Sequence, residues 1–222
     1  MHGPLALERD GAVRLRAAAL SVLPDLDRLV RALPAGQAGQ RLHGIAGLAP
    51  LLDPDSVIGA VARGVLGLAA CPVRAILFDK SPDTNWSLGW HQDRTIAVRR
   101  RVDTPGFGPW SMKRGLQHVE PPFALIERMV TLRIHLDDVP GDNAPLLVAP
   151  GSHKLGRIAE DRIEAVVAAC GMATCLADRG DVWLYATPIL HASAAGHHPH
   201  RRVLQVDYSG DRLPGQLEWL GI

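Results

Sequence analysis

Cysteine and aromatic residues are scarce in this chain of 222 residues, which has three Cys, five Trp, two Tyr and three Phe. The cysteines, Cys71, Cys170 and Cys175, are odd in number and lack the close spacing of metal ligands. This argues against a small scaffold held together by disulfides and against a cysteine-based zinc site. The sequence therefore predicts reduced thiols in a reducing compartment.

Two further absences narrow the class of protein. The net charge is only +1, so the composition gives no electrostatic basis for a nucleic-acid partner. No uncharged apolar run approaches the roughly 18–20 residues that span a bilayer, so we expect no membrane partner. Residues 1–10 also lack the basic start and apolar core of a secretory signal. We expect a cytoplasmic protein, and its oligomeric state stays open.

Residues 1–70 are rich in Ala and Leu and predict helices. One helix is expected over residues 24–33, where apolar residues recur at helical spacing and Pro34 ends the pattern. A second helix is expected after Asp53-Pro54-Asp55, a sequence that suits a helix N-terminus. Neither helix carries a catalytic constellation, so we expect this part to pack on the β-rich remainder of the chain.

From residue 71 onward, short runs of β-branched and aromatic residues alternate with Gly, Pro and Asp. The predicted strands cover residues 73–78, 90–98, 129–136, 146–148, 174–176, 182–185, 189–192 and 203–208. A helix at 160–169 interrupts them, and long loops are expected at 99–121 and 150–160. Many short strands favour a sandwich or jelly-roll barrel. We predict one mainly β domain over 1–222, with residues 1–70 packed on a jelly roll of 71–210.

A candidate metal site lies in the run Trp90-His91-Gln92-Asp93. On a strand, His91 and Asp93 would point to the same face. A His-x-Asp pattern alone is more often a hydrogen-bonded surface pair, so a third ligand is needed. His191, near the end of the β-rich part, is the best candidate. Two histidines and one carboxylate form the facial set of non-haem Fe(II) oxygenases, and Zn(II) can use the same ligands.

The strand at 201–208 adds a candidate anion site. Alternation places Arg202 with Leu204, Val206 and Tyr208, an otherwise apolar set that we expect to point into the barrel. A buried guanidinium needs an anionic partner, which a carboxylate ligand can supply. Arg201 falls on the opposite face, where we expect it to be solvated.

Together these motifs resemble the phytanoyl-CoA dioxygenase family of Fe(II)/2-oxoglutarate-dependent oxygenases. The resemblance runs from about Phe78 to Tyr208. Its anchors are Trp90-His91-Gln92-Asp93, Leu136-Asp137-Asp138, Asn143-Ala144-Pro145-Leu146, Pro150-Gly151-Ser152-His153-Lys154, Gly180-Asp181, His191-Ala192-Ser193 and Arg202. One departure is Ala144, where the family usually has Gly, so the turn there is expected to differ.

The resemblance implies a double-stranded β-helix (a cupin-like jelly roll) that holds Fe(II) through His91, Asp93 and His191. It also implies that Arg202 binds the distal carboxylate of the cosubstrate 2-oxoglutarate and that Gln92 contacts the same molecule. Such an oxidoreductase uses O2, releases succinate and CO2, and hydroxylates a small organic substrate. Related halogenases have a small residue in place of Asp93, so halogenation is not expected. The alternative function is a non-catalytic jelly roll that binds Zn(II) or senses a ligand.

Several polar residues are weaker candidates for the site. Thr131, Arg133 and His135 share one face of the strand at 129–136, and this face could line the cavity. Thr131 and Arg133 would then contact 2-oxoglutarate. Arg133 could instead contact an anionic substrate, or pair at the surface with Asp137 or Asp138. Candidate substrate contacts are His135, Lys80 and Trp110, with packing roles as their alternatives. The cluster of His197, His198 and His200 is expected to be a solvated loop and not a second metal site.

Overall fold

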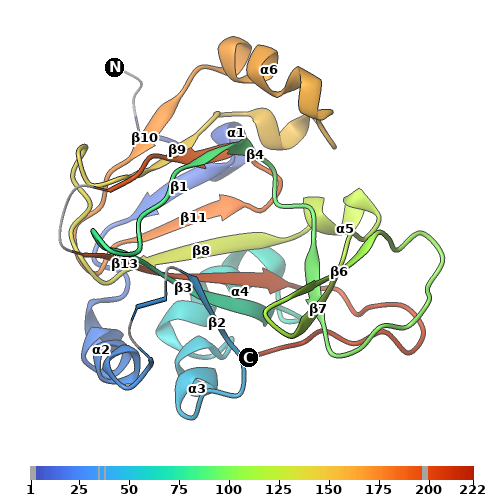
Figure 1. Ribbon diagram of the computed structural model, residues 1–222, viewed down its shortest axis with the longest axis horizontal. Helices are drawn as coiled ribbons and strands as arrows, with labels where there is room; N and C mark the ends of the chain where they lie inside the picture. Colours follow the sequence, from blue (N-terminus) through green and yellow to red (C-terminus); the bar gives the residue numbers. More distant parts are fainter. Residues whose placement is uncertain (1–3, 35, 38, 197–199) are drawn as a thin grey trace.

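The computed structural model is dominated by a six-stranded antiparallel sheet (Figure 1). The structure describes residues 4–34, 36–37, 39–196 and 200–222. In spatial order, the strands are β1 (Ala12–Leu15), β11 (Val182–Ala186), β8 (Val130–His135), β13 (Arg201–Ser209), β3 (Cys71–Lys80) and β2 (Gly39–Leu42). The longest two, β13 and β3, pair along their whole length, and residues of both line one cavity.

A second antiparallel sheet lies opposite the inner side of the large one. Its strands are, in order, β10 (Ala173–Cys175), β9 (Leu146–Val148), β12 (His191–Ser193) and β4 (Leu88–His91). Residues of both sheets line one shared cavity, as in a jelly roll. The mainly β fold predicted from the sequence is therefore confirmed.

Helices cover the outer side of the large sheet. The α-helices are α1 (Leu7–Asp10), α2 (Leu23–Arg31), α3 (Leu48–Leu52), α4 (Val57–Leu66), α5 (Phe123–Glu127) and α6 (Ile163–Cys170), and the 3₁₀ helices are η1 (Leu20–Val22), η2 (Ser152–Lys154) and η3 (Glu160–Arg162). The main apolar core lies between α2–α4 and the sheet (Figure 1), and it includes Leu26, Ile58, Leu132 and Leu204. No helix of the described residues is long and apolar enough to cross a bilayer.

The first 70 residues, for which helices were predicted, contribute two strands as well as helices. β1 pairs with β11 at one edge of the large sheet, and β2 pairs with β3 at the other. Both strands are only four residues long. Such short strands take their stability from pairing with long central strands, and local sequence gives them a weak signal.

The segment expected as one strand over residues 90–98 is split. β4 ends at His91, and β5 (Ile96–Val98) belongs to a third sheet with β7 (Leu116–Val119) and β6 (Trp110–Lys113). The expected long loop at 99–121 therefore contains a hairpin, which stands beside the barrel (Figure 1). Its two-residue turn, Arg114-Gly115, has positive φ at both positions, as a tight hairpin requires.

The turn before β9 keeps a left-handed residue although Ala144 replaces the usual Gly. Ala144 has a φ of 48° and is buried. A Cβ atom in this conformation costs about 1–2 kcal/mol. The departure seen in the sequence therefore leaves a local strain.

Candidate metal centre and its cavity

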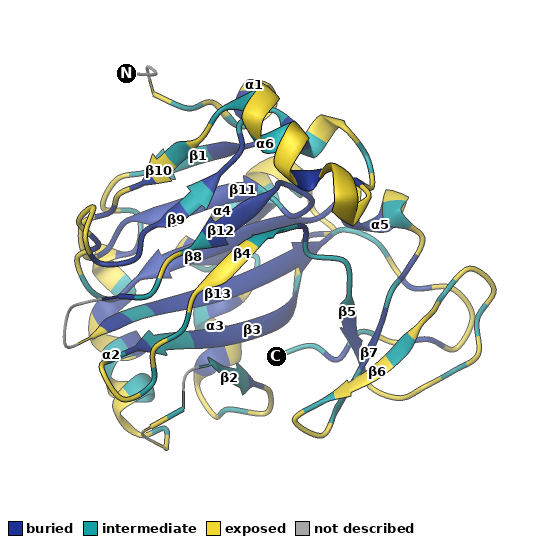
Figure 2. Ribbon diagram, turned by 45° about the horizontal axis from the view of Figure 1, so that its top comes forward, coloured by how far each residue is buried: buried dark blue, intermediate teal, exposed yellow. Residues whose placement is uncertain are grey.

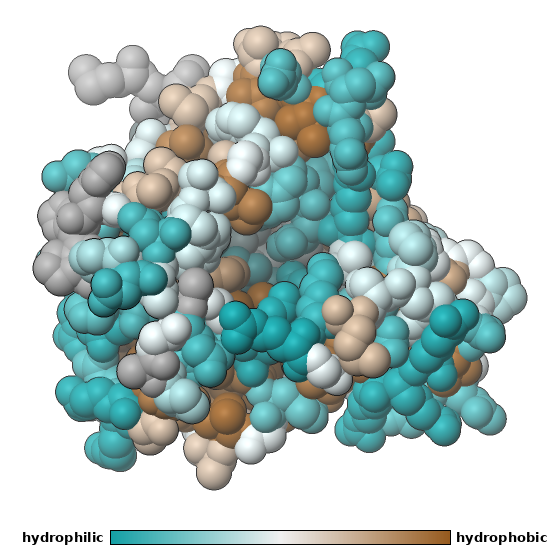
Figure 3. Space-filling model, in the orientation of Figure 1, coloured by the Kyte–Doolittle hydropathy of each residue, from teal (hydrophilic) through white to brown (hydrophobic). Residues whose placement is uncertain are grey.

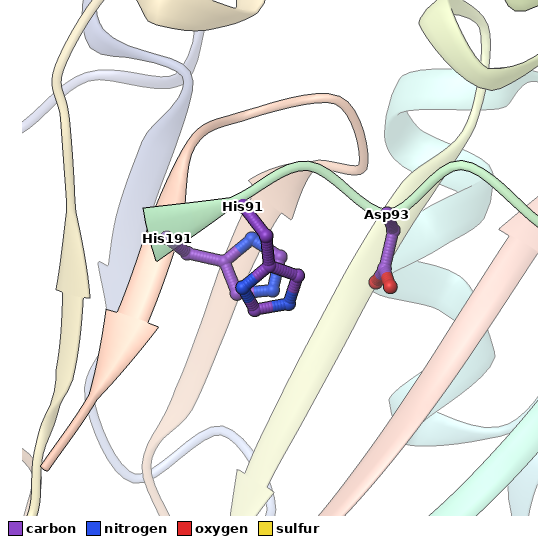
Figure 4. Close-up of side chains that lie close together, drawn as sticks. All are labelled: His91, Asp93 and His191. Atoms are coloured by element: carbon purple, nitrogen blue, oxygen red, sulfur yellow. The ribbon is translucent and has the colours of Figure 1, made fainter. Parts of the chain in front are cut away.

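Three side chains that can ligate a metal ion meet inside the cavity. One ligand atom from each of His91, Asp93 and His191 lies within 4.8 Å of the others. His91 and His191 are paired directly across β4 and β12, and their ring centroids are 4.2 Å apart (Figure 4). Asp93 follows two residues after β4 ends and turns its carboxylate toward the same side (Figure 4). The structure thus brings the three predicted ligands together.

Hydrogen bonds orient both imidazoles toward the cavity. His91 Nδ1 lies 2.8 Å from the Gly89 carbonyl, and His191 Nδ1 lies 2.9 Å from the Ile189 carbonyl. A carbonyl only accepts, so each Nδ1 carries a proton, and in the neutral tautomer the free lone pair is then on Nε2. Burial is the main cause that lowers the pKa of His191, and His91 lowers it further. Neutral imidazoles with a free Nε2 are what a metal ion requires.

A buried arginine holds the carboxylate ligand. Arg74 on β3 forms an ion pair with Asp207 on β13 through Nε, and its Nη2 lies 3.5 Å from Asp93 Oδ2. Burial opposes the charge of Arg74, but Asp207 and Asp93 raise its pKa. Burial also favours protonation of Asp93, yet Arg74 and the two histidines bring its pKa below the usual value. Asp93 is therefore an anionic ligand at neutral pH.

The metal ligands border a cavity of about 190 Å³. A hollow is visible near the middle of the face shown in Figure 3, with hydrophilic groups around it. The wall includes apolar Ile76, Phe78 and Leu146 as well as polar Arg133 and Gln205. The cavity is therefore a partly polar chamber, and its lining residues Arg41 and Lys113 are only partly buried.

Three buried cations lie together beside this chamber. They are Arg133, which lines the cavity, and Lys80 and Arg201, which are opposite one another on β3 and β13. Lys80 Nζ donates to Ser193 Oγ (2.8 Å) and to the Ala194 carbonyl. Among the described residues, Arg201 Nε and Nη1 and Arg133 Nε have no hydrogen-bond partner. In the described part of the chain, this group therefore has free donors and no acid paired with it.

Their pKa values reflect this imbalance. Burial, with Arg133 as a second cause, lowers the pKa of Arg201 to about 9. Burial followed by repulsion from Arg201 and Arg133 lowers the pKa of Lys80 to about 7. Each shift means that the protein disfavours the charged form. An anion bound here would offset this penalty for Lys80 and Arg201.

The face of β13 was predicted wrongly. Arg201, not Arg202, points into the barrel and is 1% exposed. The Arg202 side chain is 26% exposed and pairs with Asp137, to which its backbone N–H also donates (2.8 Å). Leu204, on the same face as Arg202, packs in the core under the helices. The apolar face of β13 faces the helices, and its polar face faces the cavity.

Two predicted contacts with 2-oxoglutarate have other partners. Gln92 points away from His91 and Asp93, and its amide donates to the Pro188 (2.8 Å) and Gly156 (3.0 Å) carbonyls. Its Oε1 accepts from the N–H of Ile158 (2.9 Å), so Gln92 anchors the loop before η3. In an extended segment, a residue between two others points to the opposite side, and Gln92 does so relative to His91 and Asp93.

Thr131 likewise has its hydroxyl engaged. It donates to Asp207 Oδ1 (3.0 Å), and its oxygen lies 3.0 Å from the Thr187 hydroxyl, which must then be the donor. Thr131 therefore supports the Arg74–Asp207 pair and has no hydrogen left for a ligand.

The remaining candidate site residues lie in different environments. Trp110 packs against the core of the small sheet, with Arg101 stacked 5.4 Å above its ring. His135 is buried beside the three cations, and burial and those arginines lower its pKa to about 3. Lys80 belongs to the cation group. His200 lies 3.3 Å from Asp79, and His197 and His198 are outside the described residues.

Sequence reasoning missed Arg74, Asp207 and Ser193. The sequence did contain a pattern that could have identified them. Arg74 is on the same face of β3 as Ile76 and Phe78, and Asp207 is on the same face of β13 as Gln205. Polar residues that recur at every second position of long strands indicate a lined cavity. The prediction gave weight to the apolar set and treated the polar set as solvated.

The jelly roll with two histidines and one carboxylate at an open position defines a non-haem metal site. The chain belongs to the phytanoyl-CoA dioxygenase (PhyH) family, whose model matches residues 17–203. The family recognised from the sequence is thus confirmed, and with it the place of the chain among oxygenases. No curated protein matches the chain in a sequence search.

Solved structures share the fold at low identity. EctD from S. alaskensis in its apoform is 18% identical, with a TM-score of 0.68 over 98% of this chain and 79% of that chain. HygX from Streptomyces hygroscopicus, crystallised with nickel and 2-oxoglutarate, is 15% identical, with a TM-score of 0.59 over 91% and 84%. SnoN, an alpha-ketoglutarate-dependent epimerase of nogalamycin biosynthesis, is 16% identical, with a TM-score of 0.62 over 95% and 85%. These likenesses establish the jelly-roll fold.

Proposed function

We propose that the protein is an Fe(II)/2-oxoglutarate-dependent dioxygenase that hydroxylates a small organic substrate. The observation that carries this proposal is a cavity lined by the His-Asp-His ligand set and by Arg133, with the buried cations Arg201 and Lys80 next to Arg133. Family membership supports it, as do the EctD structures with bound Fe and with 2-oxoglutarate. Bound Fe(II) and 2-oxoglutarate would supply O2 activation, with succinate and CO2 as co-products.

The donor set fits this cofactor and cosubstrate. His91, Asp93 and His191 would hold Fe(II) and leave the other positions open, as this ligand set does in oxygenases. Arg201 and Arg133 have free guanidinium donors for the distal carboxylate of 2-oxoglutarate, and a guanidinium can bind a carboxylate through two bonds. Lys80 and the Ser193 hydroxyl complete this anion site. Arg74 keeps the Asp93 carboxylate in place.

The cavity wall favours hydroxylation over epimerisation. An epimerase must return a hydrogen atom to the opposite face of the substrate, which calls for a donor such as a tyrosine or cysteine. Among the described residues, the cavity wall has neither. Asp93 occupies the position that a halide would need, so halogenation is not supported either.

Anaerobic titration of the Fe(II) protein with 2-oxoglutarate tests the proposal. We expect a weak visible charge-transfer band, followed by succinate formation when O2 is admitted. His91→Ala and Asp93→Ala should abolish both signals, whereas His200→Ala, an exposed histidine of the same chain, should keep them. A protein that binds Zn(II) but shows no band with Fe(II) would instead be a metal-binding jelly roll. A product that gains one oxygen atom would establish hydroxylation.

We also propose that the protein works in the cytoplasm. All three cysteines are free, and the Cys71 thiol is exposed. Exposed free thiols persist best in a reducing compartment. Fractionation of the source cells with an antibody against the protein would test this location.

A further inference from the structure

Two cations stand at the outer end of the metal cavity, apart from the buried group. Arg41 on β2 and Lys113 on β6 both line the same cavity as His91, Asp93 and His191. Arg41 pairs with Ile76 across β2 and β3, and opposite residues of an antiparallel pair point to the same side. Because Ile76 lines the cavity, the pairing aims Arg41 inward. Neither strand belongs to the central part of the barrel.

Within the described residues, no acid of the cavity is free to neutralise these two cations. Arg41 Nε is buried and has no hydrogen-bond partner there. Lys113 Nζ donates to a neutral hydroxyl, Thr95 Oγ1, at 3.2 Å. The one carboxylate in the described lining is Asp93, which is a metal ligand and is held by Arg74. Burial, followed by repulsion from Arg74, lowers the pKa of both Arg41 and Lys113.

We propose that Arg41 and Lys113 bind the acid group of the substrate, which is therefore a small anion. This inference rests on the proposed function, because it concerns the molecule that the metal centre would oxidise. Two anions would then share one chamber: the cosubstrate at Arg201, Arg133 and Lys80, and the substrate at Arg41 and Lys113.

The dimensions of the cavity limit the size of this anion. The chamber has a volume of about 190 Å³, and 2-oxoglutarate must occupy part of it. Thr95, which contacts Lys113, is two residues beyond the ligand Asp93, a backbone span of at most about 7 Å. The carbon to be oxidised therefore lies only a few bonds from the acid group. A short-chain carboxylate or phosphate monoester has this form.

Gly39 adds room beside Arg41. It pairs with Phe78 across the sheet, and an added Cβ would lie 3.5 Å from the Phe78 ring. Because Gly39 has no side chain, the cavity stays open between the aromatic wall and Arg41. The substrate's short apolar part can lie against Phe78 while its acid group reaches the rim.

Ligand-observed saturation-transfer NMR with three probes tests the inference. The probes are butyrate, propyl phosphate and the neutral butyramide, each added to Zn(II)-loaded protein with and without saturating 2-oxoglutarate. We expect at least one anion to bind and butyramide to bind at least tenfold more weakly. Arg41→Gln and Lys113→Met should each weaken the anion about tenfold, the value of one lost charge-assisted hydrogen bond. Which anion binds distinguishes a carboxylate from a phosphate substrate.

Arg114→Gln is the matched control. Arg114 adjoins Lys113 in the same hairpin but is exposed, and its Nη1 donates to Gln37 Oε1 (2.9 Å). Its loss should leave probe binding unchanged. Equal binding of butyramide, no binding of either anion, or full anion binding in the Arg41→Gln/Lys113→Met double variant would overturn the inference. Displacement of the anion by 2-oxoglutarate would overturn it too, because it would reveal a single anion site.

The same data separate this inference from the proposed function. If 2-oxoglutarate does not bind but butyrate still requires Arg41, the oxygenase proposal fails and the assignment of an anion site at the rim stands. If 2-oxoglutarate binds and depends on Arg201 while no probe depends on Arg41, the oxygenase proposal stands and the substrate inference fails.

Discussion

Two of the buried arginines near the metal site, Arg74 and Arg201, have opposite surroundings. Arg74 is held between Asp207 and Asp93, with Thr131 supporting Asp207 from the other side. Arg201 faces Arg133 and Lys80, and two of its nitrogens have no partner in the described part of the chain. Both strands that carry these arginines, β3 and β13, are buried along the middle of the same sheet (Figure 2).

Whether a buried arginine has an acidic partner indicates whether it supports the fold or binds a ligand. A buried charge that is paired stabilises the fold only if it stays paired, and its loss leaves the partner alone in a medium of low polarity. A buried charge without a partner costs stability in the free protein and is retained where a ligand supplies the missing charge. In the proposed function, Arg74 would therefore hold the metal ligand Asp93 in place, and Arg201 would bind the cosubstrate. Mutations beside Arg74, here called the paired end, and beside Arg201, the unpaired end, should therefore have opposite effects on stability and on ligand binding.

The largest effect is expected for Asp207→Asn at the paired end. The change keeps the shape but removes the main partner of Arg74, which should lower the free energy of unfolding by about 3–5 kcal/mol. Urea denaturation measures the loss. The control is Asp211→Asn, which breaks an exposed pair with Arg128 and should cost at most about 1 kcal/mol. Similar small losses in both variants would contradict the scaffold role of Arg74.

Arg201→Gln at the unpaired end should act on the ligand instead. We expect 2-oxoglutarate to bind about a hundredfold more weakly, from the loss of a buried charge pair in the complex. The free protein should be no less stable, because an unbalanced charge has been removed. Calorimetric titration of the anaerobic Fe(II) protein and urea denaturation give the two values. Arg202→Gln should change the affinity less than threefold; the reverse order would mean that Arg202 enters the cavity.

Gln92→Leu tests whether Gln92 supports the loop or contacts the cosubstrate. Gln92 lies between the candidate ligands His91 and Asp93 in the sequence, but its side chain bonds to loop backbone. Loss of its three hydrogen bonds to loop backbone should lower the free energy of unfolding by about 2 kcal/mol. The affinity for 2-oxoglutarate should change less than threefold. A large loss of affinity at unchanged stability would restore the cosubstrate contact that the sequence suggested.

The smallest expected effect is the uptake of a proton by Lys80 when 2-oxoglutarate binds. Lys80 has a pKa of about 7 in the free protein, so at pH 8 it is mostly neutral. A bound dianion favours its charged form, so binding of 2-oxoglutarate at pH 8 should take up a large fraction of a proton. Calorimetry in buffers of different ionisation enthalpy measures this uptake. It should vanish at pH 6, where Lys80 is already protonated, and in Lys80→Met. Binding heats that do not depend on the buffer at pH 8 would contradict it.

The lowered pKa of Lys80 also predicts how the stability of the free protein changes with pH. The pKa of Lys80 falls from 10.5 to about 7 on folding, so between these values the unfolded chain binds the extra proton. The contribution of Lys80 to stability therefore rises with pH across this window and is lost as pH falls through 7. Lys80→Met should flatten that part of the pH profile of the free protein.

Much of the architecture was predictable from local pattern. The strand expected at 146–148 matches β9, and those expected near 130 and 182 match β8 and β11 within two residues. These strands are central and buried, where β-branched residues dominate. The edge strands β1 and β2 and the hairpin of β6 and β7 were missed. Their residues are mixed, and pairing with a distant neighbour decides their conformation.

The three candidate metal ligands were predictable because spacing and residue type suffice to identify them. His91 and Asp93 have the short spacing that suits one ion, and His191 is the distant third ligand. The anion site was not predictable to the same degree. Arg201 and Arg202 are adjacent and chemically identical, so the choice between them depends on which face of β13 is turned inward.

The sequence by itself determined the family, the mainly β architecture and the three candidate ligands, because these depend on residue identity at short spacing and on strongly patterned strands. Only the tertiary structure decided the facing of β13, the partners of Arg74 and the convergence of Arg41 and Lys113 on one chamber. In this barrel, the apolar face of the large sheet packs against helices, and its polar face encloses the site. A strand with one apolar and one polar face shows which residues share a side, but not which side the helices will cover.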